Sequence, residues 1–476
     1  MVRTMGLTLE TNSGVFSRLM PGWVEPPDVF AQVADRPGSV LLESQSRGCG
    51  ARYSLIFVDP FAVLQTVGGR TILEFRHRER VLASSPFHAL RSVLRPRSPD
   101  AQLAGGAVGY FEYELHPFIE NTPVSAPDDL RLPDCRLGLY NCCAAFDHVE
   151  RTVTLNGCAV ADAPDPRDGM EALEELVLKA SHGGDRDGPL WTSPSGSATL
   201  RSNFTQAEYC AAVSRVKDYI AAGDVYQVNL SQRFTAPLGV HPWGLYLRLR
   251  ECNPAPYAAY LNAGDFQIVS SSPECFLDHD PSSRTVETRP IKGTRPRAVD
   301  PGEDRRLAAE LASSEKDIAE NVMIVDLLRN DLGRVCGYGS IAVPQLAEVE
   351  SYPTVHHLVS TITGKLREDC DCIDLLTACF PGGSITGAPK IRAVEIIDEL
   401  ETVRRGIYTG SIGCLGFDGS ARLNIAIRTA VVKDGMCHFH AGGGIVADSD
   451  PEMEYQETLD KARAFIEALG CGMILT

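Results

Sequence analysis

The sequence has no long apolar segment that would suggest a membrane protein. It also has too few basic residues to suggest a nucleic-acid-binding protein. Its 476 residues contain no run of about 18 apolar residues, the length that a transmembrane helix needs. Residues 1–14 lack the apolar core of a signal peptide. Lys and Arg number 45 against 62 Asp and Glu, a formal net charge of −17. This balance argues against nucleic acid and anionic membranes as partners, because both require a basic surface.

The 15 cysteines follow neither a disulfide framework nor a zinc site. Their number is odd, they are spread along a long chain, and no C-x-x-C pair occurs. Scattered reduced thiols are typical of a cytosolic protein. Together with the missing signal peptide, they predict a cytoplasmic location.

Hydrophobic patterning predicts an α+β protein with large antiparallel sheets. Residues 1–180 alternate short apolar runs with turn residues, and 151–157 reads as a strand that enters an Asn-Gly turn. Residues 181–200 are rich in Gly, Ser, Pro and Asp, which is typical of a linker. Residues 201–476 mix helices and strands. The sequence therefore predicts an N-terminal subdomain, a linker and a second domain with these boundaries.

Capping residues and turns predict three local structures in the second domain. Thr205 and Glu208 form a capping box for a helix over 206–222, which Gly223 would end. Pro451 begins a final helix that continues to residue 469. Asp434-Gly435 predicts a hairpin turn between strands.

Two predicted helices carry acids that are three residues apart. Asp317 and Glu320 lie on a helix over 317–331, which is apolar on both sides and is therefore predicted to be buried. Glu454 and Glu457 share one face of the final helix. Buried acids are costly unless they are paired or bind a cation, and a few carboxylates beside an anionic substrate suit Mg²⁺. Ion pairs with nearby basic residues, or a solvated face, would explain the same pattern.

Two glycine-rich loops and one basic segment could contact an anion. The loops 381–390 and 441–449 can form nests of backbone N–H groups, or simply tight turns. The first lacks the GK[ST] ending of a P-loop, which disfavours ATP or GTP hydrolysis. In 289–297, three arginines surround Lys292, and neighbouring positive charge would lower its pKa and make the amine nucleophilic. A solvent-exposed basic loop is the alternative.

A series of motifs over roughly residues 200–470 resembles the chorismate-utilising enzymes, which include anthranilate, aminodeoxychorismate, isochorismate and salicylate synthases. In order, the motifs are SSPECF, RPIKGTRPR, SEKDIAENVMIVDLLRNDLGR, VHHLVS, PGGSITGAPK, GIYTGSIG, IRTA and PEMEYQETLDKA. More weakly, SVLLES (39–44) resembles the lining of an amino-acid effector or structural-tryptophan pocket. The resemblance implies the fold of anthranilate synthase component I, with large antiparallel sheets packed as a sandwich and helices outside.

The resemblance also implies roles for individual residues. Glu320 and Glu457 match Mg²⁺ ligands, and Asp317 and Glu454 match nearby or water-mediated ones, although Asp317 stands where other members have Glu. The catalytic positions are Lys292 and Glu274. The substrate-binding positions are Gln227, Thr294, His357, Thr386, Tyr408, Arg428, Gly443, Gly444 and Lys461. The effector-pocket positions are Leu42, Glu43 and Ser44.

Two positions separate the branches of the family. Gln227 replaces the lysine that activates water in the isochorismate and salicylate branch, and Lys292 is typical of the aminodeoxychorismate branch. The resemblance implies that Lys292 attacks ring carbon 2 of chorismate while Glu274 protonates the leaving hydroxyl at carbon 4. Ammonia from a separate glutaminase subunit would then give 4-amino-4-deoxychorismate for 4-aminobenzoate and folate synthesis. The alternatives are anthranilate synthase component I and a catalytically silent chorismate-binding regulatory subunit.

Overall fold

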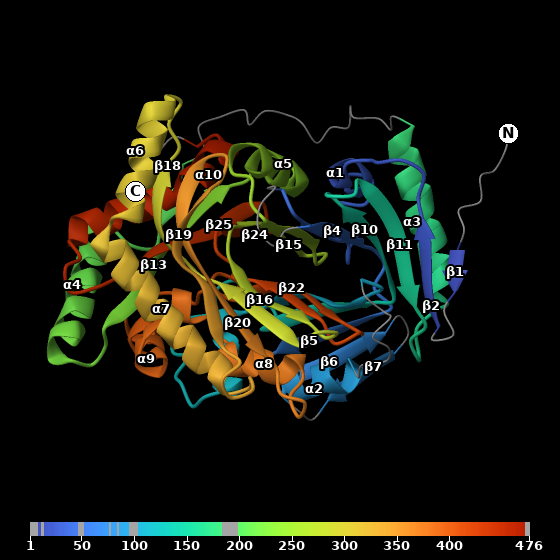
Figure 1. The fold of residues 1–476 in the computed structure, drawn as a ribbon, viewed down its shortest axis with the longest axis horizontal. Helices are drawn as coiled ribbons and strands as arrows, with labels where there is room; N and C mark the ends of the chain where they lie inside the picture. Colours follow the sequence, from blue (N-terminus) through green and yellow to red (C-terminus); the bar gives the residue numbers. More distant parts are fainter. Residues whose placement is uncertain are drawn as a thin grey trace.

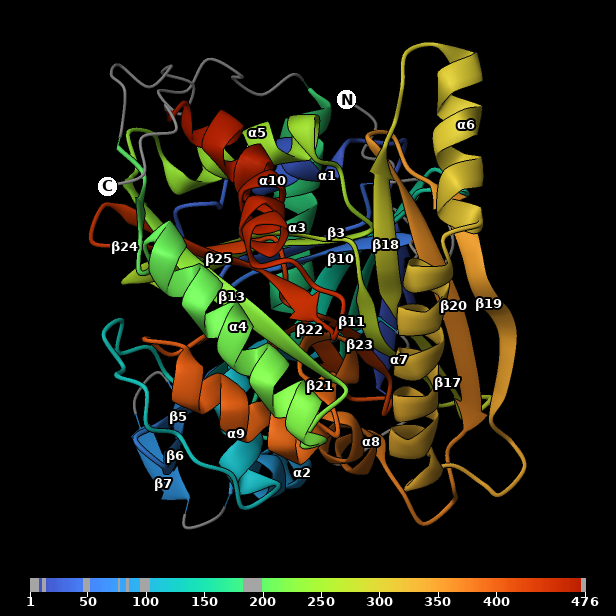
Figure 2. The same cartoon turned by 90° about the vertical axis from the view of Figure 1, so that its left-hand side faces the viewer.

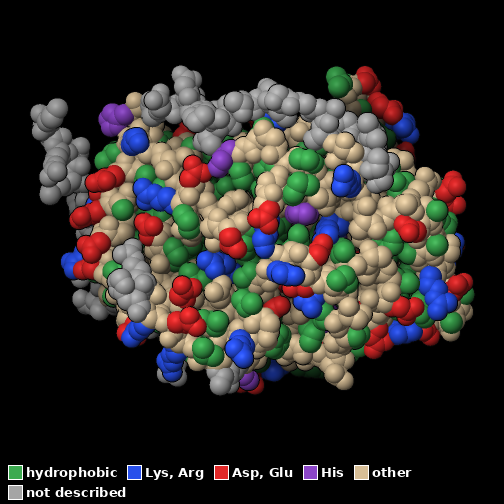
Figure 3. All heavy atoms as spheres, turned by 180° about the vertical axis from the view of Figure 1, so that it is seen from behind, with side chains coloured by type: hydrophobic (Ala, Val, Ile, Leu, Met, Phe, Trp, Pro, Cys, Tyr) green, Lys and Arg blue, Asp and Glu red, His purple; other side chains and the backbone are tan. Residues whose placement is uncertain are grey.

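Two large antiparallel sheets packed against each other, with helices on the outside, make up the computed structural model (Figure 1). The structure describes residues 8–10, 14–45, 52–75, 78–82, 85–94, 103–182 and 199–471. This architecture confirms the predicted α+β class. Within the described residues, no helix is long and apolar enough to cross a bilayer, and none of the cysteines forms a disulfide. Acidic and basic side chains are interspersed on the face in Figure 3, so the negative charge is not concentrated there.

Within the described residues the first sheet has 13 strands. Its order is β1 (Thr8–Glu10), β2 (Val15–Leu19), β11 (Thr152–Cys158), β10 (Cys142–Asp147), β4 (Tyr53–Phe57), β3 (Val40–Glu43), β14 (Tyr257–Asn262), β15 (Phe266–Ser272), β24 (Thr429–Lys433), β25 (Met436–Ile445), β13 (Gln227–Pro237) and β12 (Arg201–Ser202), with β21 (Gly387–Ala388) also paired to β13.

The second sheet has 12 strands in the same described ranges. Its order is β18 (Ile291–Pro296), β20 (Val355–Lys365), β17 (Thr285–Arg289), β16 (Cys275–Asp280), β23 (Ala421–Asn424), β22 (Ser411–Gly416), β8 (Gly106–Phe111), β9 (Cys135–Tyr140), β5 (Ala62–Val67), β6 (Arg70–Phe75) and β7 (Arg78–Leu82), with β19 (Ala342–Ser351) also paired to β20.

Both sheets join strands from the two sides of the predicted linker. Strand β3 pairs with β14, where Leu42 lies opposite Ala259, and β8 pairs with β22. The division at 181–200 remains a prediction about the chain, since residues 183–198 lie outside the described part. It does not separate one sheet from the other.

The helices cover the outer faces of the sheets (Figure 2). They are α1 (Pro26–Phe30), α2 (Pro86–Val93), α3 (Pro166–Ser181), α4 (Gln206–Ala222), α5 (Pro242–Cys252), α6 (Pro301–Ala312), α7 (Glu315–Gly333), α8 (Cys372–Cys379), α9 (Lys390–Leu400) and α10 (Pro451–Leu469), with 3₁₀ helices at Tyr113–Phe118 and Gly383–Ile385. Helix α10 packs on α4 and β25, whereas α7 packs along β18 and β20.

Local capping signals predicted α4 and α10 well. Thr205 and Glu208 form the reciprocal capping box of α4, and Gly223 ends it in the left-handed conformation at φ 84°. Helix α10 has the predicted bounds. Strands β24 and β25 meet at Asp434-Gly435, where both residues have positive φ, as the hairpin prediction requires.

Two local predictions were wrong. Asn156 and Gly157 do not form a turn but continue β11, because they pair with Ser17 and Phe16 of β2. The helix over 317–331 is buried on one side only: its Val322 is 37% exposed. Strands β18 and β20 cover one side of α7, and Val322 lies on the side that faces solvent, whereas Val325 is buried.

Candidate active site

Lys292 lies on β18 beneath α7, and its ammonium is the centre of the candidate site. Gly293, at φ 75°, allows this close approach, because a Cβ there would lie 2.9 Å from Asp317 Cγ. Burial lowers the pKa of Lys292; Glu320 opposes this effect and Lys461 adds to it. Lys292 is half-buried, and an amine with a lowered pKa is what a nucleophilic lysine requires.

The predicted direction of this pKa shift is therefore right, but its predicted cause is wrong. The three arginines near Lys292 in sequence form ion pairs with carboxylates instead. Arg289 pairs with Glu350, Arg295 with Glu310 and Asp317, and Arg297 with Asp304. Alternate residues of a strand point to opposite faces. Arginines that are close to Lys292 in sequence therefore need not lie close to its amine.

Glu274 follows β15 and is buried, with 4% of its surface exposed. Burial raises its pKa to about 7, opposed by a hydrogen bond from Ser384 and by the charge of Lys292. Ser384 Oγ donates to Glu274 Oε1 over 2.5 Å. A carboxyl group that is half protonated near neutral pH can act as a general acid.

The acids of α7 and α10 are electrostatically coupled. Burial raises the pKa of Glu320, and the negative charges of Asp317 and Glu457 contribute to the increase. Lys461, whose Nζ lies 2.6 Å from Glu457 Oε1, lowers the pKa of Glu457. Burial raises the pKa of Glu454, which accepts a hydrogen bond from Ser449.

No group of three or more His, Cys, Asp or Glu side chains in the described ranges is arranged to hold a metal ion. Asp317 is turned toward Arg295, with 3.3 Å between Asp317 Oδ2 and Arg295 Nη2. Lys316 Nζ lies 3.9 Å from Glu320 Oε1. This is an ion pair of the kind that the sequence left open as an alternative. Coupled, partly buried carboxylates nevertheless suit a cation that keeps water ligands, because Mg²⁺ needs only one or two of them.

Glycine-rich strand β25 passes next to these acids. A Cβ on Gly443 would lie 3.0 Å from Glu454 Oε2, and one on Gly444 would lie 2.2 Å from Gln227 Nε2. Gln227 is completely buried, yet both polar atoms of its amide lack a hydrogen-bond partner within the described residues. Buried amides are rarely left unsatisfied, so this amide is suited to a ligand.

Two further predicted residues have unused polar groups. His357 Nδ1 lies 2.9 Å from Thr294 Oγ1, and its buried Nε2 has no partner in the described structure. Burial lowers the pKa of His357 to about 3, which keeps the ring neutral. Burial also lowers the pKa of Arg428 to about 10, and its Nη1 donates to Asn253 over 3.0 Å. No described carboxylate pairs with Arg428, which favours an anionic ligand there.

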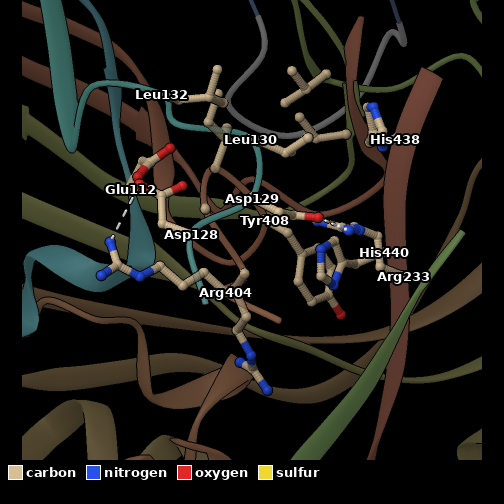
Figure 4. A pocket seen from close by; sticks show the side chains of 15 residues that line it. Glu112, Asp128, Asp129, Leu130, Leu132, Arg233, Arg404, Tyr408, His438 and His440 are labelled. Atoms are coloured by element: carbon tan, nitrogen blue, oxygen red, sulfur yellow. Dashed lines mark hydrogen bonds and ion pairs between the residues drawn. The ribbon is translucent and has the colours of Figure 1, made fainter. Parts of the chain in front are cut away.

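Thr386 and Tyr408 complete the predicted set. Thr386 is fully buried, and its main-chain oxygen accepts from the N–H of Asn229. The ring of Tyr408 stacks on His440, with 4.9 Å between centroids. Tyr408 also lines a small cavity between β25, β13 and the segment 128–132 (Figure 4).

Leu42, Glu43 and Ser44 lie elsewhere. They line a cavity of about 150 Å³ between the sheets, together with Tyr257 and Arg422 among others. The Glu43 carboxylate accepts hydrogen bonds from Tyr246, Gln45 and Arg250, so it belongs to the wall of the cavity. None of the candidate catalytic, substrate-binding or metal-binding residues lines this cavity.

Sequence reasoning missed two supporting features. One is Ser384, which sits in the predicted loop 381–390 but gave no sign that it would contact Glu274. The other is the buried ion pair of Arg405 with Glu401, 2.7 Å apart, whose guanidinium also donates to the main-chain oxygens of Ile385 and Asn229. The i,i+4 spacing of Glu401 and Arg405 could have revealed their pairing, although not its burial.

Fold and site define an α+β protein with a half-buried lysine, a buried carboxyl of raised pKa and an arginine that pairs with no described carboxylate, a combination suited to a small anionic molecule. The chain belongs to the chorismate binding enzymes, whose family pattern matches residues 39–467. It is 43% identical to anthranilate synthase component 1 of Thermus thermophilus, over 93% of this chain and 95% of that protein. It is 42% identical to aminodeoxychorismate synthase component 1 of Escherichia coli, over 92% and 95%.

A solved structure agrees with these similarities. The crystal structure of anthranilate synthase component I from Streptococcus pneumoniae superposes with a TM-score of 0.77 at 31% identity, covering 88% of this chain and 93% of that one. The predicted family and the predicted fold are both confirmed. The two named activities are nearly equal in identity, so overall similarity does not choose between them.

Proposed function

We propose that the protein adds ammonia to ring carbon 4 of chorismate and forms 4-amino-4-deoxychorismate. The observation that carries the proposal is the pair formed by Lys292 and Glu274. One is a half-buried amine with a lowered pKa, and the other is a buried carboxyl with a pKa raised to about 7. Neutral amine and neutral acid are the two protonation states that the reaction needs at the same time.

In this mechanism the Lys292 amine forms a bond to ring carbon 2 while the ring double bonds shift. The carbon–oxygen bond at carbon 4 breaks, and the hydroxyl leaves as water with the proton of Glu274. Ammonia then bonds to carbon 4, the double bonds shift back, and the bond to Lys292 breaks. Unpaired Arg428 and the neutral His357 hold the substrate, and Gln227 cannot act as a base for water.

Mg²⁺ would be held by Glu320 and Glu457, with Asp317 and Glu454 nearby, and would neutralise the ring carboxylate of the substrate. The raised pKa of Glu320 supports this assignment, since burial raises it although Lys292 and Lys316 lower it. Ammonia would come from a separate glutaminase subunit, because the relatives are named as component 1 of their synthases. The cavity at Leu42–Ser44 would hold an amino-acid effector or a structural tryptophan.

Anthranilate synthase component I is the second candidate, favoured by the 43% identical relative. Incubation with chorismate, MgCl₂ and ammonium chloride separates the two activities. We expect a product that becomes 4-aminobenzoate only when aminodeoxychorismate lyase is added. Direct release of fluorescent anthranilate would instead assign the second candidate.

Two variants test the role of the lysine. Lys292→Ala and Lys292→Arg should both lose 4-amination, because neither provides a neutral amine, while chorismate still binds in calorimetry with Mg²⁺ present. Lys179→Ala, in α3, serves as the matched control. Unchanged product and rate in the Lys292 variants would remove the covalent step from the mechanism.

A further inference from the structure

Asn253 has no role in the mechanism as described so far, although its side chain holds the guanidinium of Arg428. Helix α5 ends at Asn253, whose N–H donates to the main-chain oxygen of Leu249 over 2.8 Å. Pro254 follows, and the residue before a proline rarely stays helical. Asn253 is 7% exposed, and its Oδ1 accepts a hydrogen bond from Arg428 Nη1 over 3.0 Å. Within the described residues, this is the only hydrogen bond that the side chain of Arg428 makes.

Ser271 fixes the orientation of this amide. Asn253 Nδ2 donates to Ser271 Oγ over 3.0 Å, and Ser271 Oγ donates in turn to the main-chain oxygen of Asn253 over 2.5 Å. The N–H of Ser271 donates to the main-chain oxygen of Arg428 over 3.0 Å, which closes a ring of hydrogen bonds. A guanidinium can only donate, so the amide must present its oxygen to Arg428, and Ser271 prevents the amide from turning over.

The backbone of Arg428 is held in an unusual conformation. Its φ is 47°, in the left-handed region that residues other than glycine rarely adopt. Arg428 directly precedes β24, where Thr429 pairs with Ser270 of β15, with 2.8 Å between their hydroxyl oxygens. Strained backbone persists where the surrounding structure holds it, and it is concentrated at functional sites. The fold therefore fixes both the main chain and the side chain of Arg428.

The charge of Arg428 acts on the candidate active site. Burial lowers the pKa of His357, and the charge of Arg428 adds to this effect. His357 Nδ1 lies 2.9 Å from Thr294 Oγ1, and Thr294 is two residues after Lys292 on β18. The guanidinium that Asn253 holds is therefore close enough to act on the residues around Lys292.

An uncharged acceptor at this position keeps the arginine positive. No described carboxylate pairs with Arg428, in contrast to the three arginines of residues 289–297. Aspartate has nearly the same size and shape as asparagine, but its carboxylate would form an ion pair with the guanidinium. The amide oxygen of Asn253 instead holds the guanidinium and leaves its charge for an anionic molecule.

We propose that Asn253 is a positioning residue for the proposed reaction, which orients Arg428 toward a carboxylate of chorismate without neutralising its charge. The proposal rests on the proposed function, in which Arg428 holds the substrate. Asn253 acts through Arg428, so its replacement changes the affinity for chorismate rather than the chemical step.

The test compares chorismate binding by the full-length wild type and three variants, measured by calorimetry with MgCl₂ present. Asn253→Asp keeps the volume and the acceptor oxygen but adds a negative charge beside Arg428, whereas Asn253→Ala removes the acceptor. Asn262→Asp is the matched control. It makes the same change at another buried asparagine, which is 6% exposed at the end of β14 and donates to the main-chain oxygen of Ala34. Urea denaturation and steady-state kinetics accompany the binding measurements.

We expect Asn253→Ala to raise the dissociation constant of chorismate about fivefold, the factor that corresponds to one net hydrogen bond. Asn253→Asp should raise it about 10- to 100-fold, because the new carboxylate competes with that of chorismate for the guanidinium. Asn253→Ala should keep kcat within about threefold of the wild type, since a loss of uniform binding raises KM alone. Asn262→Asp should change neither quantity by more than about twofold.

The order of the two Asn253 variants separates positioning from packing. A purely structural asparagine predicts the reverse order, because aspartate preserves the volume that alanine removes. Chorismate binding that is as tight in Asn253→Asp as in Asn253→Ala, or tighter, would therefore overturn the proposal. If Asn253→Asp does not fold, Asn253→Ala decides, and wild-type affinity in that variant would overturn the proposal as well.

Failure of the proposed function gives a different result. The binding measurement needs no ammonia, so it is separate from the assay for the product. A wild type that binds chorismate but does not aminate ring carbon 4 refutes the proposed function, whereas the order of the dissociation constants still tests Asn253.

Discussion

Removing the hydroxyl of Ser384 should move the pH dependence of the reaction in a defined direction. Ser384 Oγ donates to Glu274 Oε1 over 2.5 Å, and both side chains are buried. The hydrogen bond favours the ionised carboxylate and therefore lowers a pKa that burial has raised to about 7. A hydrogen bond to a charged group contributes about 1.5–3 kcal/mol, and one pKa unit corresponds to about 1.4 kcal/mol.

Ser384→Ala should therefore raise the pKa of Glu274 by about one unit or more. Because the general acid must be protonated, the alkaline limb of the profile of kcat against pH should shift upward by the same amount. The assay is product formation from chorismate between about pH 6 and pH 9.5, with ammonium adjusted to constant free ammonia. Ser313→Ala, on an exposed turn after α6, is the control.

Three outcomes bear on the reasoning. An upward shift with a retained maximal rate supports an acid role for Glu274 that Ser384 tunes. An unchanged alkaline limb would show that Glu274 does not titrate in the rate-limiting step. A downward shift would show that the reaction needs the carboxylate, which contradicts the proposed protonation of the leaving hydroxyl.

Three other predictions concern stability and metal dependence. The pKa of Glu274 is about 7 in the folded protein against an ordinary value of 4.5, so it contributes stability that is present below about pH 4.5 and lost as pH rises through 7. Inactive Glu274→Gln should therefore be more stable than wild type by up to about 3 kcal/mol at about pH 8 but not at about pH 5, as measured by urea denaturation. Glu320→Gln should raise the MgCl₂ concentration for half-maximal activity roughly 10- to 100-fold. Glu315→Gln, at an exposed position of the same helix, should leave this concentration unchanged. Equal effects of the two variants would contradict the metal assignment. Arg405→Met should lower the free energy of unfolding by about 3–5 kcal/mol, because Glu401 is left buried without its ion pair. The double variant Arg405→Met, Glu401→Leu should recover most of this loss. No recovery would show that packing matters more than the charge.

The sequence predicted well those features that depend on residues a few positions apart. The capping box of Thr205, the final helix and the Asp434-Gly435 hairpin are all as expected, since each depends on local backbone chemistry. Asn156-Gly157 has the same local signal as the true hairpin but lies inside β11, because pairing with β2 outweighs a turn preference. The assignment of Glu320, Glu457 and the other site residues came from a resemblance of motifs, and it stays a prediction until the variants are measured.

What only the tertiary structure decided is the protonation of the site. The sequence by itself identified Lys292 and Glu274 as candidates and placed the chain in its family. It could not show that Ser384, 110 positions away, would donate to Glu274, or that burial rather than neighbouring arginines lowers the pKa of Lys292. The desolvation that shifts these pKa values depends on which helices and strands cover a side chain. That covering is set by the packing of the two sheets and α7, and no stretch of sequence encodes it alone.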